Sequence, residues 1–145
     1  MTTTKALLAG AALALFAFGP AAAADPNGTW LTEGGKSHVR IAGCGGAICG
    51  RIVWLKEPND PETGKPKTDK RNADAGKQSR PMIGVEIVLS MKPSGGDKWT
   101  GQVYNAEDGK TYSGNLTFSG GDSLKLQGCA LGGLVCKSQT WTKVN

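Results

Sequence analysis

The chain has 145 residues, of which 39% are hydrophobic and 22 are glycine, with one histidine and a formal net charge of +5 at pH 7. This length suits a single domain. No nucleic-acid-binding motif occurs, so we expect no nucleic-acid partner. The lone His38, without a Gly-x-Ser-x-Gly or His-Glu-x-x-His motif, leaves the common hydrolase templates without support.

Residues 1–24 have the pattern of a secretory signal peptide. Lys5 supplies a positive charge, residues 6–18 form an apolar run too short to span a bilayer, and small residues precede a cleavage site that we place after Ala24. No arginine pair precedes the run, and no cysteine stands at the cleavage site. We therefore expect Sec-type export, an unanchored periplasmic or secreted protein, and a mature domain over residues 25–145.

The rest of the chain alternates short apolar-polar runs with turn signals, which predicts an all-β domain. The expected strands cover residues 28–32, 37–42, 48–55, 85–92, 98–104, 111–118, 123–128 and 135–144. One apolar face per strand is typical of antiparallel sheets. Eight strands joined mainly by short turns predict an up-and-down barrel, because closure removes both exposed edges.

Alternation also predicts which side chains face the core. In the fourth strand, Val85, Ile87, Leu89 and Met91 alternate with polar residues, so we expect these four on one face. By the same argument His38 lies opposite the apolar face of the second strand and is solvent-exposed.

The segment from residue 56 to 80 breaks the hairpin rhythm between the third and fourth strands. It contains three prolines and few apolar residues. Long loops inside compact domains tend to be functional or disordered, so this one is either a solvated loop or a lid or contact surface. Its candidate contact residues are Lys65, Lys67, Lys70, Arg71 and Lys77.

Four cysteines form two close pairs. The spacing of Cys129 with Cys136 falls outside the usual structural zinc pattern, and an exported protein meets an oxidising compartment, which works against free thiolates at Cys44, Cys49 and the second pair alike. We therefore expect two local disulfides across hairpin turns and no metal site, although four cysteines allow three connectivities.

Several segments resemble one protein family. Gly28-Thr29-Trp30 opens the match, and it continues through residues 50–55, 80–84, 99–104, 107–113 and 139–144. These segments resemble the DUF2147 family, exported bacterial proteins of uncharacterised function with a lipocalin-like barrel. The resemblance implies that fold and transfers no catalytic residue. Asn105-Ala106 and Lys143 depart from the family pattern without threatening the fold.

The resemblance also implies structural roles for aromatic residues. In lipocalin-like barrels a Gly-x-Trp on the first strand packs near a basic side chain of the last strand, which assigns these positions to Trp30 and Lys143, with Trp141 nearby. Other aromatic, basic and apolar residues of the family-like segments either fill the barrel or line its mouth. The candidate ligand-binding residues are Trp54, Arg80, Met82, Trp99, Tyr104 and Tyr112.

These observations predict a non-enzymatic, exported β-barrel protein without a cofactor. It would bind a small hydrophobic or anionic ligand in the cell envelope. The alternatives are a protein-binding inhibitor or accessory factor of a periplasmic hydrolase, and a purely structural envelope protein. The positive net charge also predicts a weak attraction to anionic envelope surfaces.

Overall fold

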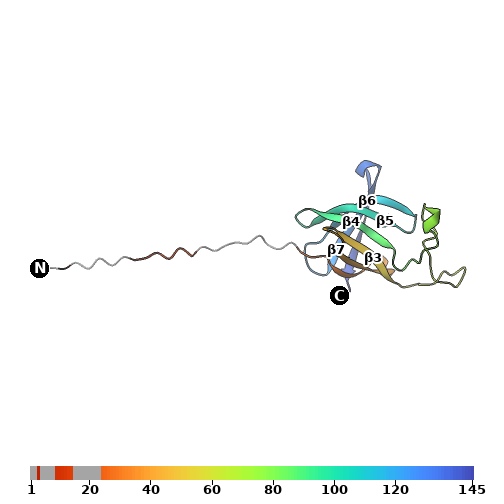
Figure 1. Ribbon diagram of the computed structural model, residues 1–145, viewed down its shortest axis with the longest axis horizontal. Helices are drawn as coiled ribbons and strands as arrows, with labels where there is room; N and C mark the ends of the chain where they lie inside the picture. Colours follow the sequence, from red (N-terminus) through yellow and green to blue (C-terminus); the bar gives the residue numbers. More distant parts are fainter. Residues whose placement is uncertain (1–2, 4–8, 15–23) are drawn as a thin grey trace.

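A computed structural model describes residues 3, 9–14 and 24–145 of the chain, and the predicted signal peptide lies largely outside these ranges. Eight antiparallel strands close into a barrel in sequential order (Figure 1), which confirms the predicted fold class. The strands are β1 (Gly28–Leu31), β2 (Ser37–Gly43), β3 (Ile48–Leu55), β4 (Glu86–Gly95), β5 (Lys98–Asn105), β6 (Lys110–Thr117), β7 (Ser123–Ala130) and β8 (Val135–Lys143). Three single-turn 3₁₀ helices, η1 (Glu33–Gly35), η2 (Ala75–Lys77) and η3 (Leu131–Gly133), lie in the connections.

In the part of the chain that the structure describes, no helix is long and apolar enough to cross a membrane.

The interior of the barrel is filled by side chains from all of its strands. Two inward-facing glycines make room for this packing, since a β-carbon on Gly114 would stand 2.3 Å from Val103 and one on Gly50 would stand 3.0 Å from Val39. Close packing of this kind is what an eight-stranded interior permits. The core consists of Trp30, Val39, Ile41, Ile48, Ile52, Val88, Met91, Trp99, Leu116, Phe118, Leu124, Leu126 and Trp141.

The predicted inward face of the fourth strand is wrong in part. The structure buries Val85, Val88 and Met91, whereas Leu89 is only half-buried. The pairing of β3 with β4 shifts register between Glu86 and Val88, which leaves Ile87 as an extra residue. The pairing of β4 with β5 shifts again after Leu89, where Ser90 takes a φ of 44°. An extra residue in one strand of a pair reverses the alternation beyond it, so a strict period of two fails in β4.

The seam of the barrel joins β1 to β8. Trp30 is fully buried, lies edge-on to Phe118 with ring centroids 5.3 Å apart, and donates its indole N–H to the Pro26 carbonyl at 2.9 Å. Lys143 is its cross-strand partner, with Nζ 5.9 Å from the Trp30 ring centroid. This is the arrangement that the family resemblance implies, and Trp141 is buried in the same core.

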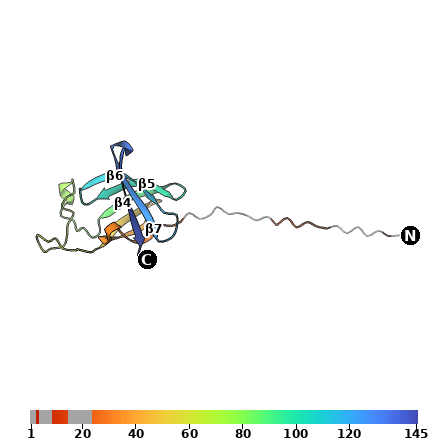
Figure 2. The same ribbon diagram turned by 180° about the vertical axis from the view of Figure 1, so that it is seen from behind.

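Both predicted disulfides are present, Cys44–Cys49 and Cys129–Cys136, and the described part of the chain contains no free cysteine. The up-and-down topology puts the β2–β3 turn at one end of the barrel. By the same alternation, the β1–β2, β5–β6 and β7–β8 turns and the long β3–β4 connection belong to the other end, which we call the loop end. Figures 1 and 2 show the long connection at one side of the barrel and the β7–β8 hairpin projecting separately above it.

Candidate functional site

The long connection between β3 and β4, residues 56–85, is folded against the loop end of the barrel. Two isolated bridges, Asn59 with Pro66 and Thr68 with Pro81, give it local β-pairing. At its far end the Val85 carbonyl accepts a hydrogen bond from the Ile52 amide at 3.0 Å. The prolines and polar residues of this segment therefore form an ordered cover rather than a free coil.

A buried carboxylate organises this cover. Asp69 is fully buried, and its Oδ1 accepts the Tyr104 hydroxyl at 2.6 Å. Its Oδ2 accepts Asn72 Nδ2 at 2.9 Å, Arg80 Nε at 2.9 Å and Arg80 Nη2 at 2.8 Å. A buried charge is tolerated when it is paired and hydrogen-bonded in this way. We call Asp69, Asn72, Arg80 and Tyr104 the Asp69 cluster.

The Asp69 cluster also raises the pKa of the Tyr104 hydroxyl. Burial, together with the hydrogen bond that the hydroxyl donates to Asp69, raises the pKa of Tyr104 to about 12. Arg80 lies over the ring at 5.6 Å from its centroid, a cation–π contact that adds to the ion pair. Tyr104 therefore stays protonated at neutral pH and serves as a hydrogen-bond donor within the cluster.

The cover is also fixed to the β5–β6 turn. Ala73 donates its amide to the Gly109 carbonyl at 3.3 Å, and Arg71 donates to the Glu107 carbonyl at 2.8 Å. A β-carbon on Gly109 would stand 1.6 Å from the Arg71 carbonyl oxygen, so any other residue would displace the loop. The Asp108-Gly109 pair is thus both a hairpin turn and a docking point for the cover.

A cleft of about 800 Å³ opens between this cover and the barrel wall, and we call it the basic cleft. The Asp69 cluster forms part of its wall. Arg51 pairs with Glu86 at 3.5 Å, and the Asp74 carboxylate accepts the Gly76 amide at 2.9 Å. Within the described residues, Lys77 and Lys110 have no ion-pair partner. The charged lining residues are Arg51, Lys77, Arg80 and Lys110, with Asp74 and Glu86.

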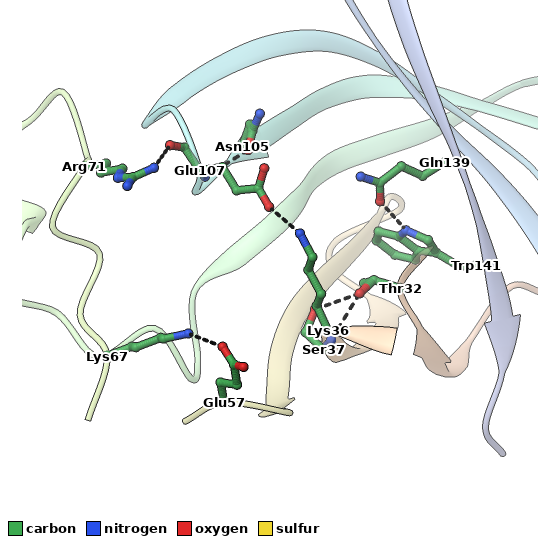
Figure 3. A network of polar contacts seen from close by, with 10 residues as sticks. All are labelled: Thr32, Lys36, Ser37, Glu57, Lys67, Arg71, Asn105, Glu107, Gln139 and Trp141. Atoms are coloured by element: carbon green, nitrogen blue, oxygen red, sulfur yellow. Dashed lines mark hydrogen bonds and ion pairs between the residues drawn. The ribbon is translucent and has the colours of Figure 1, made fainter. Parts of the chain in front are cut away.

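Two further clefts, of about 370 and 510 Å³, lie on the other side of the cover and share Lys67, Met82, Ala106 and Glu107. Figure 3 shows how Lys36 reaches Glu107 at 3.4 Å and Lys67 reaches Glu57 at 3.9 Å. Most charged side chains that line these two smaller clefts are therefore paired with other side chains of the protein. Of the buried hydrophobic residues in the described chain, only Ile52 and Tyr104 line any of the three clefts.

The structure brings only part of the predicted ligand-binding set together. Arg80 and Tyr104 meet in the Asp69 cluster, and Met82 packs against the core beneath the two smaller clefts. Trp99 is a core residue at the opposite end of β5. Tyr112 donates its hydroxyl to Asp108, and this hydrogen bond raises the pKa of Tyr112.

Trp54 lies apart from this set, which corrects its predicted place at the barrel mouth. The β2–β3 register shifts so that Val39 pairs with Ile52 and His38 with Trp54, which leaves Val53 as an extra residue. The bulge turns Trp54 outward, where it is 41% exposed and stacks on His38 with ring centroids 4.4 Å apart.

The predicted contact loop is less free than its composition suggests. Lys70 pairs with Asp60 at 2.9 Å, and the hydrogen bond that it donates lowers the pKa of Asp60. Lys67 and Arg71 are held by Glu57 and by the Glu107 carbonyl. Of the five predicted contact residues, all of them described, Lys65 and Lys77 have no side-chain partner, and only Lys77 faces the basic cleft.

Asp69, Asn72 and Gly109 are the site residues that sequence reasoning did not select. The available signal was Asp69 itself, an acidic residue within a strongly basic stretch that ends at Arg80. Among the described residues no group of three or more His, Cys, Asp or Glu side chains is arranged to hold a metal ion.

Comparison with known proteins agrees with this architecture. The family model described as "Uncharacterized protein conserved in bacteria (DUF2147)" matches residues 28–143. The chain belongs to the DUF2147 family. The matched range holds all eight strands, both disulfides and the Asp69 cluster of this DUF2147 protein.

A solved structure extends the comparison to the fold. It is described as protein HP1028 from the human pathogen Helicobacter pylori, which belongs to the lipocalin family. The two chains are 23% identical with a TM-score of 0.69, and the match covers 83% of this chain and 84% of the other. This likeness shows a lipocalin-like barrel. No protein with a curated description matches this DUF2147 chain.

Proposed function

We propose that this DUF2147 protein is a non-enzymatic, exported binding protein that holds a small anionic ligand in the basic cleft. The observation that carries the proposal is the cleft itself, about 800 Å³ in volume, beside a barrel whose interior is already filled. That volume lies within the range of small-molecule sites in proteins. A ligand therefore sits at the loop end, between cover and wall, rather than deep inside the barrel.

The charge of the lining favours an anion over a hydrophobic molecule. Four basic and two acidic side chains line the cleft. Since Glu86 pairs with Arg51 and the Asp74 carboxylate caps η2, Lys77 and Lys110 are left to meet a ligand. Charge-assisted hydrogen bonds from such groups are stronger than neutral ones.

The Asp69 cluster supplies a preorganised donor. Two nitrogens of Arg80 are bound to Asp69, and within the described chain no protein acceptor meets the remaining Nη1. The guanidinium is thereby held in one orientation while part of it faces the cleft. A fixed donor loses less conformational entropy on binding than a free surface arginine does.

The chemistry of the cleft supports binding rather than catalysis. Tyr104 keeps its proton, with its pKa raised to about 12 by burial and by its bond to Asp69. Asp69 accepts bonds from three neighbouring side chains, so its lone pairs are engaged. The one histidine, His38, stacks on Trp54 outside the cleft.

The test is an NMR titration of the full mature chain with inorganic phosphate and with citrate, followed at backbone amides. We expect saturable shifts at residues 72–77, 80 and 110. The double variant Lys77→Gln, Lys110→Gln should raise the dissociation constant at least about tenfold, because two charge-assisted hydrogen bonds are lost.

The matched control is Lys92→Gln with Lys98→Gln, two exposed lysines outside the cleft with the same change in net charge. The control should bind as the unmodified protein does. Absence of saturable shifts with both anions, or equal weakening in both double variants, would show that the cleft is not an anion site.

A further inference from the structure

The tip of the β7–β8 hairpin exposes aliphatic side chains that the fold does not use. Leu131 is 73% exposed, Leu134 is 86% exposed and Val135 is 50% exposed. Single exposed leucines are common on protein surfaces, but three neighbouring aliphatic residues at one projecting tip form a patch. We call residues 130–135 the apolar tip.

The apolar tip is held in one conformation. The Cys129–Cys136 disulfide closes its base, and Ala130 pairs with Val135 just beyond it. Leu134 donates its amide to the Leu131 carbonyl at 3.3 Å. Leu131 has a φ of 54°, a left-handed conformation that is rare for a bulky residue. Rare backbone conformations persist where the surroundings enforce them and are frequent at binding segments.

The apolar tip also stands clear of the barrel. The pairing of β6 with β7 ends at Ser113 and Cys129, so the tip lies beyond the last rung. On its other side, β8 pairs with β1 only through Thr142 and Lys143. Figures 1 and 2 show the result, with the blue hairpin projecting past β6 in both views.

The charged side chains of the hairpin that carries the apolar tip are all positive. From Ser123 to Asn145 the chain contains no aspartate or glutamate. Lys137 is the lysine nearest the tip, since Lys125 pairs with Thr140 and Lys143 with Trp30 toward the other end of the hairpin. Lys137 is exposed and lies two positions after Val135. The basic cleft, with Lys110, opens at the same end of the barrel. The apolar tip with Lys137 beside it therefore suits a surface that is anionic outside and apolar beneath.

We propose that the apolar tip is a membrane-docking device that inserts Leu131, Leu134 and Val135 among the lipids of an anionic bilayer surface. A short convex tip suits this partner, because a lipid surface adapts to the tip while a protein would need a matching groove. Interfacial segments bury their apolar side chains about 5–10 Å deep and keep their cations at the headgroups. Lys137 is placed for that contact. This proposal does not depend on a ligand in the basic cleft.

The test is flotation of the mature protein with vesicles of phosphatidylglycerol and phosphatidylethanolamine, compared with vesicles of phosphatidylcholine. We expect binding to the anionic vesicles only. Leu131→Ser with Leu134→Ser should lower the partition coefficient at least about tenfold, because two leucine side chains leave the lipid. Lys137→Gln should lower it roughly fivefold, because one cation leaves the surface.

The matched control is Val53→Ser with Ile83→Ser, two exposed aliphatic residues that lie outside the apolar tip. This variant should float as the unmodified protein does, and circular dichroism checks that each variant is folded. Failure of the unmodified protein to float with anionic vesicles would overturn the proposal, as would equal flotation of the Leu131/Leu134 variant. If vesicles are not bound but cross-linking from the tip captures a protein, the tip docks on protein and the membrane assignment is wrong.

Discussion

The cover and the apolar tip invert the usual rule of burial in opposite ways. The cover buries a carboxylate, Asp69, which is fully enclosed, whereas the tip leaves Leu134 86% exposed. Both segments lie at the loop end of the same barrel. Charged residues are rarely fully buried unless paired, and a patch of exposed aliphatic residues is uncommon in a monomer, so each departure needs its own reason.

The difference between them lies in the partners. Asp69 finds all its partners within the chain, in Asn72, Arg80 and Tyr104, so its burial explains the order of the cover. The aliphatic side chains of the apolar tip are exposed, and in the described part of the chain η3 packs chiefly beside its own two strands, β7 and β8. A segment satisfied within the chain is explained by folding. A rigid segment that is not satisfied points to something outside the chain.

The largest expected effect is on the cover. Asp69→Ala should lower the free energy of unfolding by about 3 kcal/mol, because Arg80 and Tyr104 then lose their common partner in a buried site. The expected value is at the low end for a broken buried pair, since the Arg80 side chain is 36% exposed. Chemical denaturation measures the change, and hydrogen exchange should show residues 66–84 opening.

The matched control for that variant is Glu57→Ala, which removes a largely exposed ion pair with Lys67 from the same loop. Surface pairs of this type contribute little to stability. If the two variants lose equal stability, the Asp69 cluster does not hold the cover, and the contrast between the two regions fails.

A second effect follows from the pKa of Tyr104, which rises from 10.0 to about 12 in the folded protein. Since the folded-state pKa lies above the unfolded value, the stabilisation is complete below pH 10 and is lost as pH rises from about 10 towards 12. We expect a loss of about 1–2 kcal/mol over that window, because solvent in the adjoining cleft screens part of the interaction.

Thermal unfolding across that pH window, compared with Tyr104→Phe, measures the effect. The Tyr104→Phe protein should be less stable at neutral pH and should lose less stability as the pH rises. Tyr112→Phe is the comparison, because the bond to Asp108 on a more exposed hairpin turn also raises the pKa of Tyr112. We expect this variant to change the pH profile less than Tyr104→Phe does. If the stability of Tyr104→Phe depended on pH as that of the unmodified protein does, Tyr104 would not contribute to the stability of the Asp69 cluster.

The smallest effect is expected at the apolar tip. Leu131→Ser with Leu134→Ser should change the free energy of unfolding by less than about 0.5 kcal/mol, because neither side chain contacts the core. Denaturant unfolding with the disulfides intact measures it. A large loss of stability would mean that the apolar tip stabilises the fold, and the contrast with the cover would be wrong.

Much of the barrel could be predicted because its signals are local. Alternating residues and glycine-rich turns define the strands, and the spacing of Cys44 with Cys49 and of Cys129 with Cys136 indicates two hairpin disulfides. Strand ends differ from expectation by only a few residues. The bulges, among them those at Val53 in β3 and at Ile87 and after Leu89 in β4, were not predicted, because the position of an extra residue depends on the partner strand.

The candidate site was predicted less well, for a related reason. Arg80 and Tyr104 were selected as ligand-binding candidates, yet the residue that joins them, Asp69, lies 35 positions before Tyr104. Two residues so far apart in the sequence leave no local pattern from which their contact could be predicted. Trp54 was grouped with them because it belongs to a family-like segment, and the bulge at Val53 turns it to the outer face instead.

The sequence by itself therefore determined the eight strands, their closure and the two disulfides, since each follows from the chemistry of near neighbours. Only the tertiary structure decided that the basic loop folds back as a cover, that Asp69 holds it, and that the β7–β8 tip stands free. Those outcomes depend on which distant groups meet when the barrel closes. A side chain's burial and charge partners are properties of that closed shape rather than of the residues beside it.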